Sequence, residues 1–82
     1  MFSEEKLKKV VGSILSISPD SINDQSTKDN VKNWDSLKHM NLILALEEEF
    51  EVTIPDEEAA DLTSYPLIRL VMKDLVAAKS ES

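Results

Sequence analysis

The sequence contains no cysteine, one glycine and three prolines among its 82 residues. Without cysteine, the chain can form no disulfide and no thiolate metal site. Long apolar runs are also missing: the longest is Leu42–Leu46, far shorter than the roughly 20 residues that span a membrane as a helix. The first residues, Met1–Glu5, lack the basic region and apolar core of a secretory signal. We therefore expect a cytoplasmic protein with no membrane insertion.

A length of 82 residues leaves room for one domain, which we place at residues 1–82 with an ordered part of about 3–78. A chain of this size buries only roughly 60% of the surface that its unfolded form exposes, so its core is small. Leu, Ile, Val and Phe supply 24 of the 82 residues, above the roughly 20% below which a charged chain stays disordered. The composition predicts a folded globule, which we expect to be a monomer.

The formal net charge of −7 is concentrated in one segment. Residues 35–61 hold nine acidic side chains against Lys38 alone, whereas residues 1–34 hold five acids and five bases. Such a segment repels nucleic acid and anionic membranes, and it attracts basic patches on partner proteins. Acidic faces are also common on small domains that have no such partner. Composition therefore argues against nucleic acid but does not by itself identify a protein partner.

Helical spacing of apolar residues predicts a first helix from about Ser3 to Ser16, with Ser3 as its N-cap. Its buried stripe consists of Leu7, Val10, Val11, Ile14 and Leu15. Gly12 interrupts this pattern at a cost of about 1 kcal/mol relative to alanine. It indicates either close packing against a neighbouring helix or simple tolerance.

The rest of the chain reads as a long loop followed by three helices. Residues 17–34 contain Pro19, three Asn and four Ser or Thr residues, and we expect a loop that includes at most a helical turn. Helices are predicted at about Ser36–Glu51, at Asp56–Leu62 and from near Ser64, with Pro66 in the first turn of the last one. The last helix places one apolar side toward the core, comprising Leu67, Ile68, Val71, Met72, Leu75 and Val76. The predicted class is all-α, with three main helices and one short helix.

The helix at Ser36–Glu51 carries two apolar stripes. The first stripe consists of Leu42, Ile43, Leu46 and Phe50, and the second stripe of Leu37, Met40 and Leu44. Asn41, Glu47, Glu48 and Glu51 border the second stripe. One stripe is enough to dock a helix, so the second is either more core or an exposed strip that meets a partner.

A serine, a histidine and an aspartate at the start of this helix raise the possibility of a hydrolase. Ser36, His39 and Asp35 lie within one helical turn, however, and no glycine-rich nucleophile elbow or oxyanion loop accompanies them. His39 is better explained as a partly buried polar residue at the edge of the core. Glu47–Glu49 point in different directions around the helix and cannot converge on one ion, so we predict no metal site.

Ser36 also stands at a helix N-terminus, where backbone N–H groups and the helix dipole stabilise a phosphate ester. It lies on the seam between the two stripes, so an arm attached there can reach the core or the second stripe. Asp-Ser before a helix is usually only a cap. The dipeptide alone therefore does not establish a modification site.

Three further segments, taken with Asp35-Ser36-Leu37, resemble the acyl carrier protein family. They are Glu4–Gly12 in the first helix, Ala45–Phe50 (ALEEEF) and Ile54–Ala59 (IPDEEA). The resemblance runs from about Ser3 to Val76. It implies a small acyl-carrier-like helical bundle in which a phosphopantetheinyl transferase attaches 4′-phosphopantetheine, taken from coenzyme A, to Ser36. Acyl groups then ride as thioesters on the arm, and the carrier itself catalyses nothing.

The resemblance also assigns roles to both stripes. The recognition surface that meets basic patches on transferases, synthases and other acyl-transferring enzymes comprises Asp35, Leu37, Met40, Leu44, Glu47 and Glu48. Leu42, Leu46 and Phe50 would line an expandable core that shelters the acyl chain. The implied pathway is fatty acid, polyketide or related biosynthesis. The alternative function is an unmodified helical adaptor that binds a protein through the acidic and apolar face.

Two departures from the usual family pattern flank the motif. Carriers of fatty acid synthesis usually have a small pair such as Gly-Ala before Asp-Ser, where this chain has Asn33-Trp34. Acids common early in the recognition helix are replaced by Lys38, His39 and Asn41. Lys38 lowers the negative potential beside Ser36, which shifts partner selection. We therefore expect a specialised discrete carrier.

Overall fold

The computed structural model describes residues 2–81, with side chains described for residues 2–79. Its elements are α1 (Glu4–Leu15), the 3-10 helix η1 (Pro19–Ser21), α2 (Ser36–Phe50), α3 (Asp56–Asp61) and α4 (Tyr65–Glu81). Within residues 2–81, β pairing is limited to one isolated antiparallel bridge between Thr27 and Ser64. The predicted all-α fold with three main helices and one short helix is confirmed.

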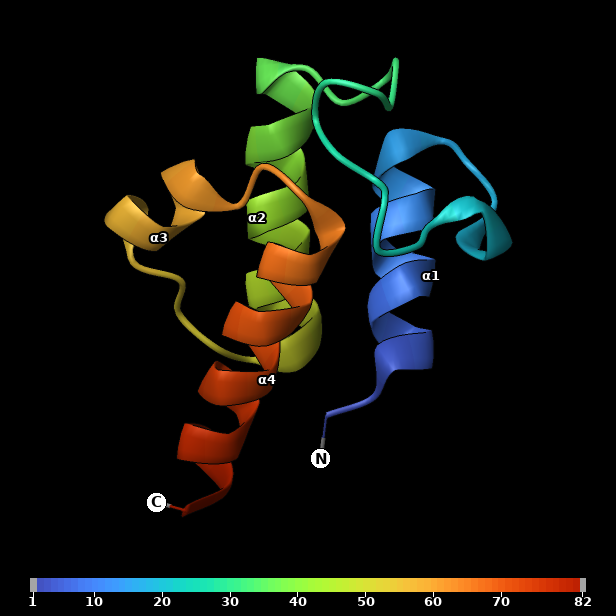
Figure 1. Ribbon diagram of the computed structural model, residues 1–82. Coiled ribbons are helices and arrows are strands. Elements are labelled where there is room, and N and C mark those ends of the chain that lie inside the picture. The colour runs from blue at the N-terminus through green and yellow to red at the C-terminus, as the bar shows by residue number, and fades with distance from the viewer. Residues whose placement is uncertain (1, 82) are drawn as a thin grey trace.

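The helices are arranged around α2 (Figure 1). α1 packs beside α2, and α3 lies on the opposite side of α2 from α1 in this view. The connection from α1 crosses the end of the molecule at which α2 begins, while the start of α1 and the end of α4 lie toward the other end. The start of α2 is therefore presented at one pole of the bundle.

Local capping accounts for the limits of α1. The Ser3 hydroxyl accepts a hydrogen bond from the Lys6 N–H at 3.2 Å, as the sequence predicts. The helix ends at Ser16, whose φ of 58° is left-handed and whose N–H bonds to the Gly12 carbonyl. Gly12 itself is buried against the following turn, since a Cβ there would lie 2.7 Å from the Ile17 carbonyl oxygen. The expected close packing is real, but its partner is this turn and not a neighbouring α-helix.

The long connection is fixed to the bundle by buried side chains and backbone bonds. Ile22 and Trp34 are almost fully buried. The loop contains one short helical segment, η1, in agreement with the expectation of no more than a helical turn. The Lys28 N–H bonds to the Thr63 carbonyl at 2.8 Å, and the Tyr65 N–H bonds to the Ser26 carbonyl at 2.9 Å. These bonds hold the loop against the start of α4.

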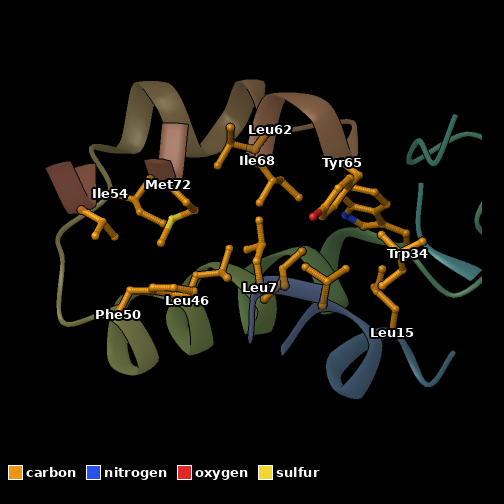
Figure 2. Packing of buried hydrophobic residues seen from close by; sticks show 14 residues of the cluster. Leu7, Leu15, Trp34, Leu46, Phe50, Ile54, Leu62, Tyr65, Ile68 and Met72 are labelled. Carbon is orange, nitrogen blue, oxygen red and sulfur yellow. The ribbon is translucent and has the colours of Figure 1, made fainter. Parts of the chain in front are cut away.

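Side chains from α1, α2 and α4 meet in a single core, which Figure 2 shows from close by. Its buried members are Leu7, Val11, Leu15, Ile22, Trp34, Leu42, Leu46, Phe50, Ile54, Leu62, Tyr65, Ile68, Met72 and Val76. The prediction for α4 was wrong at Leu67, which is 42% exposed. At 3.6 residues per turn, Leu67 lies about 140° around the helix from the buried Met72. The core-facing stripe of α4 is therefore narrower than the sequence pattern predicts, and Leu67 lies outside it.

A polar cluster joins α4 to α1 and to the loop. The buried Tyr65 hydroxyl donates a hydrogen bond to Glu4 Oε2 at 3.1 Å. Arg69 Nη1 donates to the same Glu4 oxygen at 3.0 Å and lies 2.8 Å from Asp24 Oδ1. The bonds from Arg69 and Tyr65 hold the pKa of Glu4 below its ordinary value. Burial, together with the bond to Glu4, raises the pKa of Tyr65 well above its ordinary value of 10.0.

The raised pKa of Tyr65 predicts a loss of stability in alkali. Because the folded state disfavours the tyrosinate, stability is fully present below pH 10 and is lost as the pH rises above it. The loss is about 1.4 kcal/mol per pH unit. At pH 7, Tyr65→Phe should be less stable than the wild type by about 1 kcal/mol, because it lacks the hydrogen bond to Glu4. Between pH 10 and 11.5, its free energy of unfolding should fall by less than that of the wild type. Guanidinium unfolding of both proteins at these pH values tests the prediction. An equal fall in the free energy of unfolding of the two proteins between pH 10 and 11.5 would contradict it.

Candidate functional site

The site is built at the pole of the bundle where α2 begins. Trp34, almost fully buried, anchors the chain just before the helix. Asp35 is the N-cap, and its Oδ1 accepts a hydrogen bond from the Lys38 N–H at 2.8 Å. Ser36 follows as the first helical residue, with an exposed side chain. A buried anchor thus leads directly into an exposed serine.

Ser36 has the surroundings that a phosphate ester requires. The first helical hydrogen bond runs from the His39 N–H to the Asp35 carbonyl at 2.8 Å. The N–H groups of Ser36 and Leu37 precede this bond and have no partner within the helix. Together with the positive end of the helix dipole, they favour an anionic group at the Ser36 hydroxyl. The residues at this pole therefore fit a phosphate-linked arm.

The structure decides between the alternatives left open for the two stripes. Leu42 and Leu46 of the first stripe are fully buried. Leu37, Met40 and Leu44 of the second stripe are 67%, 64% and 61% exposed. The second stripe is therefore an exposed apolar strip and not additional core.

The acidic residues beside the strip differ in their exposure and in their hydrogen bonds. Glu48 is exposed. Glu47 is half-buried, and its Oε2 accepts a hydrogen bond from the Ile54 N–H at 2.8 Å. Asp35 is exposed but is held by its capping bond. Of these three predicted partner-binding acids, Glu47 thus also holds the chain that leads into α3.

An open groove of about 340 Å³ lies between α2 and the segment that contains α3. It is lined by His39, Met40, Ile43, Leu44, Glu47, Ile54, Asp56, Ala59 and Ala60. His39 and Met40 stand about one helical turn after Ser36, so this part of the groove lies about one turn along α2 from the exposed serine. Leu42, Leu46 and Phe50, the residues expected to line an acyl pocket, are buried in the core. Figure 2 labels Leu46 and Phe50 there.

Sequence reasoning did not identify Ile43, Ala59 and Ala60 as groove residues. Ile43 was assigned to the first stripe, but it is only half-buried and faces the groove. The small side chains of Ala59 and Ala60 were an available signal, because two consecutive alanines on a short helix leave space beside it. The pairing of α3 with α2, however, has no signature in the local sequence.

His39 is half-buried at the edge of the core, as expected from its position on the helix. Its Nδ1 accepts a hydrogen bond from the Trp34 indole N–H at 3.0 Å, and its Nε2 lies 2.7 Å from the Ala59 carbonyl oxygen. Because a carbonyl only accepts, Nε2 carries the proton. The single lone pair of the neutral ring is therefore already bound by Trp34. This leaves His39 no means to act as a general base for Ser36.

Residues 2–81 contain no helix long and apolar enough to cross a membrane. No group of three His, Cys, Asp or Glu side chains in this part of the chain is placed to hold a metal ion.

The chain is similar to known proteins. Residues 5–66 match a family model described as "Phosphopantetheine attachment site". A protein of Thermosynechococcus vestitus named acyl carrier protein is 40% identical over 74 residues, covering 90% of this chain and 91% of the relative. One of the same name from Buchnera aphidicola is 40% identical over 73 residues, covering 89% of this chain and 94% of the relative.

The fold is also similar to a solved structure. A solution NMR structure of holo acyl carrier protein from Geobacter metallireducens superposes with a TM-score of 0.85 at 22% sequence identity. The similarity covers 99% of this chain and 93% of that chain. At this level of identity, the match supports the arrangement of the helices.

Proposed function

Since this chain belongs to the acyl carrier protein family and carries 4′-phosphopantetheine, we propose that Ser36 is the residue to which the arm is attached. The observation that supports this assignment is the exposed Ser36 at the first position of α2, two residues after the buried Trp34. The serine oxygen can be approached from solvent, and the helix N-terminus favours the phosphate that is joined to it.

When attached, the arm supplies a terminal thiol that holds acyl groups as thioesters. The protein is a non-catalytic carrier of such groups. The roles of its own residues are to fix the attachment point, to present the arm and to contact other proteins. The hydrogen bonding of His39, whose two ring nitrogens both have partners, is consistent with a carrier that performs no acyl transfer itself.

The surface around Ser36 is proposed to bind the partner enzymes. It comprises Asp35, Leu37, Met40, Leu44, Glu47 and Glu48, and the three apolar members are well exposed. The net charge of −8 on residues 35–61 steers basic surfaces toward this face, while the apolar strip supplies contact area. The proposed partners are a phosphopantetheinyl transferase and acyl-transferring or synthase enzymes with basic docking patches.

The acyl chain is proposed to enter the bundle next to the arm. The groove between α2 and α3 begins at His39 and Met40, and Leu42, Leu46 and Phe50 lie in the core behind it. Because those core side chains are closely packed, a chain that reaches them must displace them. Burial of the acyl chain would keep the thioester away from water until a partner removes it.

The flanking residues favour a specialised carrier of fatty acid, polyketide or related biosynthesis. Lys38 places a positive charge two residues after Ser36, and His39 and Asn41 contribute no negative charge. Partner enzymes that require acids at these positions should bind this chain poorly. The monomeric state and the cytoplasmic location stay predictions. No observation favours the alternative of an unmodified adaptor.

Intact-mass measurement after incubation with a broad-specificity phosphopantetheinyl transferase and coenzyme A tests the proposal. The wild-type chain should gain one phosphopantetheine, and Ser36→Ala should gain none. Ser13→Ala, which removes an exposed serine from α1, is the matched control and should be modified like the wild type. If Ser36→Ala were still modified, or if no transferase modified the folded wild-type chain, the assignment of Ser36 would be wrong.

A further inference from the structure

One imidazole ring joins three parts of the molecule at the pole that carries Ser36. The ring of His39 on α2 bonds Trp34 in the loop at 3.0 Å and the Ala59 carbonyl oxygen of α3 at 2.7 Å. The two rings are nearly parallel, with centroids 6.2 Å apart and planes inclined by 21°. Trp34 is two residues before Ser36, and Ala59 lines the groove.

Glu47, like His39, is a side chain of α2 that bonds the backbone of the segment containing α3. Glu47 Oε2 bonds the Ile54 N–H at 2.8 Å, before α3 begins. His39 bonds the carbonyl of Ala59, near the end of α3. The two side chains, eight residues apart on α2, therefore hold both ends of the same segment. Between these two bonds, α3 itself is mostly exposed, with Ala59 its one half-buried residue.

The two hydrogen bonds of the ring demand its neutral form. The indole N–H of Trp34 can only donate, and the Ala59 carbonyl can only accept. A proton added to the ring binds the lone pair of Nδ1, and the bond from the indole breaks, while the bond from Nε2 to Ala59 remains. The buried Trp34 indole N–H would then face another N–H without an acceptor.

We infer that His39 is a positioning residue, which holds Trp34, and thereby the segment leading into Ser36, in place while its ring is neutral and releases it when the ring is protonated. Lys38 is the neighbouring charged residue on α2, and Glu47 and Asp56 are the charged residues that line the groove with His39. The functional consequence rests on the proposed attachment at Ser36.

The composition of the chain allows a direct spectroscopic test, because Trp34 is the single tryptophan and His39 the single histidine. Trp34 fluorescence and the NMR signal of its indole N–H should be recorded between pH 5 and 8 on the full unmodified chain. Both should change with the same midpoint as the ring-proton signals of His39. His39→Gln keeps a donor and an acceptor without a titratable ring, and its Trp34 signals should stay constant over this range.

Two results would overturn the inference from these spectra. One is a wild-type Trp34 signal that stays constant while His39 titrates. The other is the same Trp34 transition in His39→Gln. Neither result depends on the attachment of the arm, so the spectra judge the role of the ring separately from the proposed function.

The effect on Ser36 is measured as kcat/KM of phosphopantetheine addition at pH 7.5. His39→Ala, which removes both hydrogen bonds, should lower it about tenfold, and His39→Gln should lie between this variant and the wild type. Equal values for His39→Ala and the wild type would exclude a positioning role. If Ser36→Ala were modified as well, the proposed attachment site would fail instead, so the two failures are distinguishable.

Discussion

Leu46→Ala should lower the free energy of unfolding by about 3 kcal/mol, whereas Leu44→Ala should change it by less than about 0.5 kcal/mol. The two leucines lie two residues apart on α2, and the substitution removes the same atoms from each. Leu46 is fully buried, while Leu44 is 61% exposed. The helix propensity gained with alanine is the same at both positions, so the difference reports burial alone.

The expected loss at Leu46 is large for a chain of this length. Domains have about 0.05–0.15 kcal/mol of stability per residue, so one such cavity removes a substantial part of the total. Urea unfolding followed by circular dichroism gives both free energies. Similar losses for the two variants would mean that the second stripe is part of the core, contrary to the structure. Leu44→Ala should instead weaken binding of a transferase to the folded carrier.

Gly12→Ala should destabilise the fold by about 1–3 kcal/mol, although alanine favours an isolated helix by about 1 kcal/mol over glycine. The new Cβ would lie 2.7 Å from the Ile17 carbonyl oxygen and 3.3 Å from the Pro19 nitrogen. Both neighbours are backbone atoms, so the turn after α1 must move to make room. The Ile17 N–H of that turn also donates a hydrogen bond to the Gly12 carbonyl, at 3.0 Å.

Ser13→Ala is the control for helix propensity, because Ser13 is exposed on the same helix. It should leave stability unchanged or raise it by a few tenths of a kcal/mol. Thermal and urea unfolding of the two variants measure the difference. A Gly12→Ala protein more stable than the wild type would show that the turn is free to move and that the glycine is merely tolerated.

The helices of this protein follow from local features of the sequence. Apolar residues at helical spacing mark α1, α2 and α4, and Ser3 and Asp35 mark two N-termini through bonds to residues three positions ahead. Because these interactions span a single turn, the predicted limits of α1 and α2 agree with the structure to within one residue at each end. The acyl carrier family is likewise visible in the sequence, since its motifs are short and contiguous.

The surfaces of the site could not be predicted in the same way. Periodicity showed two stripes on α2, but it did not show which one α1 and α4 would cover. The same limitation explains Leu67, which shares the spacing of the core residues of α4 and yet lies outside the contact. A helical pattern records directions around one axis, whereas burial depends on where the neighbouring helices stand.

By itself, then, the sequence determined the helices, their caps and the exposed serine motif, because each rests on residues close together in the chain. The tertiary structure decided that Leu37, Met40 and Leu44 face solvent, that Gly12 contacts the turn after its own helix, and that a groove opens between α2 and α3. It also decided the bonding of His39, whose partners are 5 and 20 residues away along the chain. Only folding brings such groups within hydrogen-bond distance, so no local pattern encodes them.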